Sequence, residues 1–144
     1  MTAVVTRRAA LAAALAFALS SVAGGAGAQD PAATEAARAA RDWLALADAL
    51  DAETSLREAG AKYRAALTPE RWREALAIVR EPLGAVVQRT LAGSQAVSRL
   101  QGLPDGDYAQ VMYRTSWTNK SIGREYVTLE RESGRWRVIG YVVQ

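Results

Sequence analysis

The chain has 144 residues, 50% of them hydrophobic, and carries 18 basic and 15 acidic residues but no histidine and no cysteine. This length and apolar content predict one domain with one hydrophobic core and argue against intrinsic disorder. The missing residue types exclude a structural zinc site, a serine triad with a histidine base and a disulfide framework within this chain. We therefore expect no metal centre and no cofactor.

The N-terminal segment has the layout of a secretory signal peptide. A pair of arginines precedes an apolar run over residues 9–23, and a stretch of small residues leads to an expected cleavage before Gln29. The run is shorter than the ~20 apolar residues of a bilayer span, which disfavours an alanine-rich membrane anchor. We predict a signal peptide over residues 1–28 and a single α+β domain over residues 29–144.

Export would place the mature chain in the periplasm or outside the cell. Loss of Arg7 and Arg8 leaves 16 basic against 15 acidic residues, so the formal net charge falls from +3 to +1. Charges of both signs lie side by side in segments 71–74 and 130–132, which indicates a solvated surface and no nucleic-acid partner. Residues 6–11 loosely resemble a twin-arginine signal, so both the general secretion route and the twin-arginine route stay open.

Helical periodicity covers the first half of the mature chain. Asp30 and Pro31 predict a helix start. The apolar stripe that follows contains Ala36, Ala40, Trp43, Leu44, Ala47 and Leu50. A second stripe runs from Leu56 to Leu67 after a bend, and Thr68-Pro69 ends it and begins a further helix whose Trp72 we expect in the core.

The second half of the mature chain reads as four antiparallel strands. They are predicted over residues 86–97, 108–117, 124–132 and 135–143. A Gly-Ser pair at residues 93–94 predicts a bulge in the first strand. A two-residue turn, Ser133-Gly134, predicts a tight hairpin between the last two strands.

This tight hairpin predicts a register. One face pairs Glu132 with Arg135, Glu130 with Arg137, Thr128 with Ile139 and Tyr126 with Tyr141; the other pairs Arg131 with Trp136, Leu129 with Val138 and Val127 with Gly140. The second face, together with Val142, is the predicted core side. Tyr126, Ile139 and Tyr141 then form an apolar patch on the first face, a predicted partner surface for another protein or a second copy of the chain.

Several short motifs resemble a known family. They are the Trp43-Leu44-x-Leu46-x-Asp48 segment, the Thr68-Pro69-Glu70-x-Trp72 segment, Arg80-Glu81-Pro82-Leu83-Gly84 followed by Arg89, the Leu103-Pro104-Asp105-Gly106-x-Tyr108 segment, and the Gly134-x-Trp136-Arg137-Val138-x-Gly140-Tyr141 segment. In this order they resemble the exported bacterial domain-of-unknown-function family forty-nineteen. The resemblance covers essentially the whole mature chain. It implies a cystatin-like or nuclear-transport-factor-two-like fold, in which N-terminal helices pack on a curved four-stranded antiparallel sheet that can enclose a pocket.

The residues favour a non-catalytic module that binds a ligand or a protein. A first alternative is a pocket enzyme of the isomerase or dehydratase type, with Asp48 as the carboxylate and Tyr108 or Tyr113 as donor. A second is an accessory subunit of an envelope complex. No catalytic residue is assigned on the favoured interpretation.

The candidate ligand-binding residues are Arg80, Arg89 and Tyr108. Arg80 lies near a predicted helix end, where arginine is also favoured by the helix dipole. If Arg80 and Arg89 both point into a pocket, their guanidinium groups are suited to hold a carboxylate. The small molecule or protein that would bind is not identified by the sequence.

Overall fold

The computed structural model describes residues 30–144, and the predicted signal peptide lies outside them. The described part contains the helices α1 (Pro31–Asp48), α2 (Ala52–Glu58), α3 (Ala61–Ala66) and α4 (Pro69–Arg80), with a short 3-10 helix, η1 (Glu81–Leu83), after α4. The strands are β1 (Val86–Val97), β2 (Tyr108–Trp117), β3 (Lys120–Glu132) and β4 (Arg135–Val143). They form one antiparallel sheet in the order β1-β2-β3-β4, which confirms the predicted α+β class.

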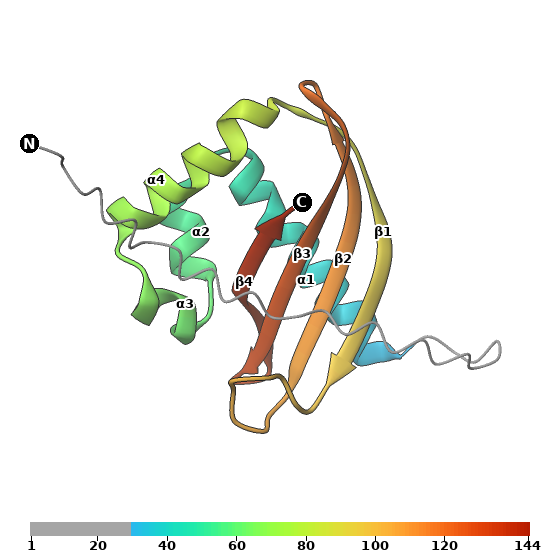
Figure 1. Cartoon of the computed structure of the whole chain (residues 1–144). Helices are drawn as coiled ribbons and strands as arrows, with labels where there is room; N and C mark the ends of the chain where they lie inside the picture. The colour runs from blue at the N-terminus through green and yellow to red at the C-terminus, as the bar shows by residue number, and fades with distance from the viewer. Residues whose placement is uncertain (1–29) are drawn as a thin grey trace, which may run out of the picture.

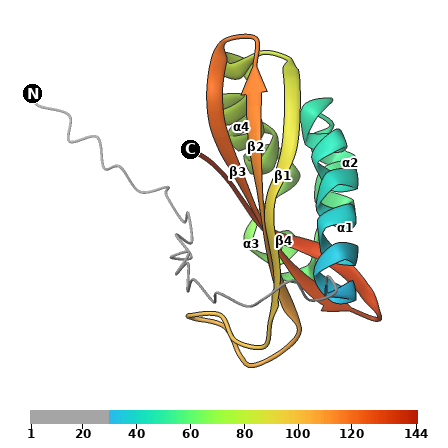
Figure 2. The same cartoon turned by 90° about the vertical axis from the view of Figure 1, so that its right-hand side faces the viewer.

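The helices cover one face of the sheet and one of its edges. In Figure 1, α1 crosses behind the sheet, and α2, α3 and α4 lie beside β4. Figure 2 shows β1 at the opposite edge, with α1 on one side of the sheet. We call the face covered by α1 the inner face and the opposite one the outer face. No helix within residues 30–144 is long and apolar enough to cross a membrane.

Polar caps set the helix starts that the sequence predicts. The Asp30 carboxylate accepts a hydrogen bond from the Ala32 N–H at 3.0 Å, and Thr68 Oγ1 accepts one from the Arg71 N–H at 3.2 Å. Each cap satisfies a backbone donor that has no partner inside its helix. Proline follows each cap at the first helical position, where its missing N–H costs nothing.

The sequence predicts one helix over the second apolar stripe, but the structure contains two, α2 and α3. The chain leaves the helical path between α2 and α3 because the Gly60 N–H donates to the Val138 carbonyl on the edge of β4, at 2.7 Å. A side chain at Gly60 would begin 2.7 Å from Ile139 Cγ2, so the approach needs glycine. The break docks α3 against the edge of the sheet.

The predicted turn and bulge are both present. Ser133 and Gly134 have φ values of 49° and 78°, the left-handed geometry that a two-residue hairpin needs. The pairing of β1 with β2 shifts between Leu91 and Gly93, which confirms the predicted bulge.

The predicted register of the last hairpin is right as far as Leu129 and wrong beyond it. Leu129 pairs with Val138, but the next pairs are Thr128 with Gly140, Val127 with Tyr141 and Tyr126 with Val142. Ile139 is therefore an extra residue in β4, and such a bulge moves all later side chains to the opposite face. Tyr141 turns toward the core, and Val142, predicted in the core, is 37% exposed.

The core lies between α1 and the inner face. Its side chains include Ala36, Ala40 and Leu44 of α1 and Val111, Val127, Leu129 and Val138 of the sheet, each at most 2% exposed. Small alanines let α1 approach the sheet closely, as dense packing requires. The predicted core side of the hairpin is thereby confirmed for the three valine and leucine positions nearest its turn.

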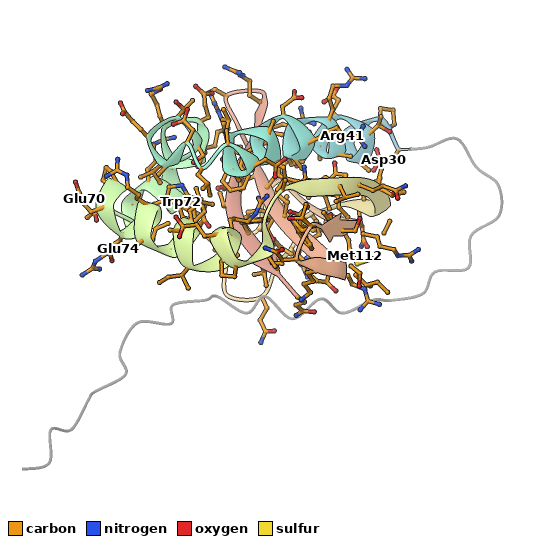
Figure 3. The ribbon with its side chains drawn as sticks, turned by 90° about the horizontal axis from the view of Figure 1, so that it is seen from above. Asp30, Arg41, Glu70, Trp72, Glu74 and Met112 are labelled. Atoms are coloured by element: carbon orange, nitrogen blue, oxygen red, sulfur yellow. The ribbon has the colours of Figure 1, made fainter. Side chains whose placement is uncertain are left out.

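An aromatic cluster closes the core beside β4. The ring of Trp43 lies 5.9 Å from that of Trp72, 6.5 Å from that of Tyr63 and 5.4 Å from that of Tyr141. Both indole N–H groups bond to Ser55: Trp43 to its carbonyl at 2.8 Å and Trp72 to its hydroxyl at 2.9 Å. In Figure 3, Trp72 points inward from α4, which confirms it as a core residue.

Candidate functional site

The fold brings Arg80 and Arg89 together beneath the helices. Arg80 is the last residue of α4, and Arg89 lies on the inner face of β1, opposite Thr115. Their side chains are 3% and 11% exposed. Two guanidinium groups in such surroundings need compensating charge.

Two carboxylates supply that charge. Arg89 donates from Nη1 and Nη2 to Asp48 at 2.7 and 2.8 Å, and from Nε and Nη2 to Glu125 at 2.6 and 2.9 Å. Arg80 donates from Nη2 to Asp48 at 2.6 Å. Arg80 Nη1 lies 4.0 Å from Glu125 Oε1. We call these four side chains the inner ion cluster.

Glu125 is the most deeply placed member of the inner ion cluster. It is fully buried on β3 and accepts further hydrogen bonds from Thr115 Oγ1 and from the Tyr141 hydroxyl, both at 2.9 Å. The Tyr141 oxygen also accepts a bond from Arg80 Nη1 at 3.3 Å. The β4 bulge is what turns Tyr141 to this face, so the bulge completes the cluster.

Ionisation follows these contacts. Partial burial works to raise the pKa of Asp48, but the hydrogen bonds from Arg89 and Arg80 outweigh it and hold the pKa below its ordinary 3.8. Burial works to lower the pKa of Arg89, yet its bonds to Asp48 and Glu125 raise it. Burial, reinforced by the charge of Glu125, raises the pKa of Tyr141. These shifts keep Asp48 as the anion, Arg89 as the cation and the neighbouring Tyr141 as a neutral phenol.

The inner ion cluster is organised to hold the fold together. It ties the end of α1 (Asp48) and the end of α4 (Arg80) to the sheet, and Arg89 donates four hydrogen bonds, two to Asp48 and two to Glu125. A ligand carboxylate would have to displace one of the chain's own. Within the cluster, Arg80 Nε is buried without a hydrogen-bond partner.

Tyr108 does not join the two arginines. It pairs with Glu130 across the outer face, and its hydroxyl donates to the Pro104 carbonyl at 2.8 Å. The Lys62 ammonium group lies 5.9 Å from its ring and bonds to Glu130. Ligand binding by Arg80, Arg89 and Tyr108 stays a prediction, but these residues do not form a single site.

The tyrosines considered for an enzyme lie apart from Asp48. The Tyr113 hydroxyl donates to the Ala37 carbonyl at 2.6 Å, and the Tyr108 hydroxyl to Pro104. The carboxylate that does contact a tyrosine hydroxyl is Glu125, which is held by arginine.

Two open grooves flank Trp136, and neither is lined by the inner ion cluster. One, of about 320 Å³, lies between α1 and β4 with Trp43 and Trp136 in its wall. The other, of about 230 Å³, lies between the start of α1 and the ends of β1 and β2. The buried charges therefore do not face a ligand cavity at either groove.

The outer face carries a different arrangement. Side chains alternate between the two faces along β2 and β3, so the residues between the inward-facing ones point to the outer face. Met112, Tyr126 and Val142 pair in one row across three strands, and Arg114 pairs directly with Arg124 in the next. In Figure 3, Met112 lies on the side of the sheet away from α1. We call these five residues the outer patch.

The predicted partner surface is thus altered. Tyr126 belongs to the outer patch, but Tyr141 lies on the inner face. Ile139 is the extra residue of the bulge and lies next to Gly60: a Cβ atom added to Gly60 would be 2.7 Å from Ile139 Cγ2. The three residues do not form one patch, because the bulge separates them.

The family model for proteins of unknown function DUF4019 matches residues 39–141. The chain belongs to this family. No curated protein and no solved structure matches the chain. The DUF4019 match spans the inner ion cluster, from Asp48 to Glu125, and all but one residue of the outer patch, Val142.

Three residues of this DUF4019 chain were not predicted from the sequence: Glu125, Arg114 and Arg124. A signal for Glu125 existed: it breaks an alternation of apolar residues on the inward side of a strand, with Val127 and Leu129 beyond it. Recognising the opposed arginines needed the register of β2 against β3, which a two-residue turn at residues 118–119 sets. That register could not be predicted because the third strand was expected to begin at residue 124, whereas β3 begins at Lys120.

Proposed function

We propose that this DUF4019 domain is a non-catalytic protein-binding module that acts after export and binds its partner through the outer face. The observation that carries this proposal is the uneven cover of the sheet: the helices pack on the inner face and beside β4 (Figure 1), and α3 reaches the outer face only near the last hairpin, where Lys62 bonds to Glu130. The part of the outer face that carries Arg114 and Arg124 is exposed. A partner that binds there would meet a rigid, hydrogen-bonded surface, so little ordering cost opposes binding.

The apolar row of the outer patch supports a protein partner. Met112 and Val142 lie in the same row on either side of Tyr126, and Val142 is 37% exposed. Aromatic and methionine side chains are enriched at protein interfaces, where they bury area at modest entropic cost. The same surface would serve an accessory subunit of an envelope complex.

The inner ion cluster supports a non-catalytic role. A general base needs a pKa near the working pH, whereas the pKa of Asp48 is lowered. The Tyr141 hydroxyl is hydrogen-bonded to Glu125, and burial raises its pKa. The acids and the phenol that could do chemistry are engaged with each other.

Export is supported by the arginine pair, apolar run and small-residue stretch of residues 1–28. The test is to express the full chain in a Gram-negative host and determine the N-terminus of the protein released with the periplasm. A mature chain that begins at Gln29 is expected. Recovery of the intact chain from the cytoplasm alone would contradict export.

Binding is tested by site-specific photocrosslinking in cells. A photoreactive phenylalanine analogue replaces Met112 in one variant and Arg38, exposed on α1, in a matched control. A discrete adduct from position 112 and none from position 38 is expected. An adduct with twice the mass of the chain would identify a second copy as the partner. Equal labelling from both positions, or none from position 112, would contradict the proposal.

A further inference from the structure

The directly opposed arginines of the outer patch are unusual in a sheet. Arg114 on β2 and Arg124 on β3 are register partners, and both are exposed. Opposed residues in antiparallel strands have Cβ atoms roughly 5 Å apart, and like charges at this spacing are destabilising. The remainder of the sheet pairs charges differently: Glu132 with Arg135, and Glu130 with Arg137.

Neither arginine is neutralised by the chain. No ion pair joins Arg114 or Arg124 to any acidic side chain within residues 30–144, whereas the exposed Arg99 pairs with Asp105 and the half-buried Arg131 with Glu35. On the side of β1 the neighbouring side chains are uncharged: Thr90 beside Arg114, and Gln88 and Ser116 in the adjacent row. On the other side, Arg124 exchanges two backbone hydrogen bonds with Gln144, at 2.8 and 2.9 Å.

The nearest acid on this side of β3 is already engaged. Glu130 lies six residues from Arg124 along β3, and its two carboxylate oxygens accept hydrogen bonds from Lys62 Nζ at 2.6 and 2.7 Å. The two guanidinium groups thus create a local positive site on a mature chain whose formal net charge is only +1. Attraction for an anion here comes from the pair and not from the protein's overall charge.

We infer that Arg114 and Arg124 form a clamp for the carboxylates of an acidic polypeptide segment. This inference rests on the proposed function and names the chemistry of its partner. Each guanidinium group can hold a carboxylate through two parallel hydrogen bonds, and two neighbouring carboxylates relieve the repulsion between the arginines. A free phosphate would satisfy the clamp as well, but it would leave the adjoining Met112 and Val142 row uncovered.

The clamp and the apolar row together define the segment. The bound segment presents acidic side chains to the arginine row and apolar side chains to the Met112 and Val142 row. The two rows are roughly 7 Å apart, because they are separated by two residues along a strand. The apolar side chains bury Met112 and Val142, and the carboxylates set the position of the segment.

The test compares two double charge reversals. Arg114→Glu with Arg124→Glu inverts the clamp, and Arg71→Glu with Arg73→Glu makes the same change in net charge at two exposed residues of α4. Each is combined with the photoreactive residue at position 112, and circular dichroism checks that each variant folds. The clamp reversal is expected to lower the adduct yield about tenfold or more, and the α4 reversal to leave it near the wild-type level.

Three titrations of the purified mature protein identify the anion. The probes are a short synthetic peptide of glutamate and leucine, inorganic phosphate, and phosphatidylglycerol vesicles, each followed by NMR of the arginine side chains and the methionine methyl groups. The peptide is expected to shift Arg114, Arg124 and Met112 together, and the clamp reversal to abolish this. Tighter binding of phosphate or of vesicles than of the peptide would overturn the inference in favour of a free anion or a membrane surface.

The outcomes separate the inference from the proposed function. An adduct from position 112 that survives the clamp reversal keeps the outer face as binding surface and overturns the clamp. The absence of any adduct in the wild-type background overturns the proposed function, while the peptide titration still decides whether the clamp binds carboxylates. Equal losses in the two reversals would indicate a net-charge effect and overturn the clamp.

Discussion

Two arginine pairs lie on opposite faces of the same sheet and have opposite surroundings. Arg80 and Arg89 are buried on the inner side: Arg89 contacts Asp48 and Glu125 at 2.6–2.9 Å, and Arg80 contacts Asp48 at 2.6 Å. Arg114 and Arg124, the clamp, are exposed on the outer face and have no acidic partner within residues 30–144. The residue type is the same, so the difference comes from solvation.

Burial decides which pair the chain itself must neutralise. A guanidinium group removed from water loses hydration free energy that only close carboxylates can replace, so the inner pair is committed to the fold. An exposed guanidinium group keeps its water and remains able to exchange it for a ligand. The inner pair is therefore expected to govern stability and the outer pair to govern binding.

The largest expected effect is on the inner pair. Glu125→Gln leaves the guanidinium group of Arg89 with one carboxylate and the cluster with excess positive charge in a dry site, which is expected to cost about 3–5 kcal/mol of unfolding free energy. Urea denaturation measures it. Adding Arg89→Gln restores neutrality beside the remaining Arg80–Asp48 pair and should recover part of the loss. Additive losses in the double variant would contradict the charge-balance argument.

Asp48 should make stability depend on acid. Because its folded-state pKa lies below its unfolded value, Asp48 stabilises the fold at pH above about 4, and this contribution is lost as pH falls through the lower folded pKa. Asp48→Asn is expected to cost about 1–3 kcal/mol at pH 7 and progressively less toward acid. The measurement is urea denaturation over a pH series; a constant difference between the two proteins would contradict it.

A smaller effect tests the bulge that places Tyr141 on the inner side. Tyr141→Phe removes one hydrogen bond to Glu125 and one acceptor for Arg80, and is expected to destabilise the domain by about 1–2 kcal/mol. Thermal unfolding at neutral pH detects it. Partner crosslinking from position 112 should be unchanged. If Tyr141→Phe leaves the stability unchanged, the bulge is contradicted, because Tyr141 points outward in the register without a bulge.

The smallest expected effect has the opposite sign and concerns the outer pair. Arg114→Gln removes the repulsion with Arg124 and is expected to raise the unfolding free energy by about 0.2–1 kcal/mol. The gain should shrink at high salt, because exposed charges are screened. Arg71→Gln on α4 provides the control, with no opposed cation to relieve. A loss of stability on Arg114→Gln would show that the arginine supports the fold.

Local signals in the sequence predicted most of the secondary structure. Proline after Asp30 and after Thr68 sets the helix starts because its ring fixes φ. Ser133-Gly134 sets the last hairpin because glycine accepts the left-handed φ that the turn needs. The break at Gly60 was missed because its cause is a hydrogen bond to Val138, which lies far along the chain.

The candidate site was predicted only in part, for the same reason. Arg80 and Arg89 could be selected from the sequence, since one lies at a predicted helix end and the other on the strand that follows it. Their carboxylate partners could not, because Asp48, Arg80, Arg89 and Glu125 come from four different elements. The bulge at Ile139 places Tyr141 on the inner face and Val142 on the outer face, the reverse of the prediction. The bulge was not predicted from the residues of the last strand.

By itself the sequence determined the class of the fold, the order of its helices and strands, the tight turn and most of the core, because apolar periodicity and restricted backbone angles act over a few neighbouring residues. Only the tertiary structure decided which charges are paired and which are left to solvent. That outcome depends on the register between strands and on burial by distant helices, which put Arg89 against Glu125 on one face and Arg114 against Arg124 on the other.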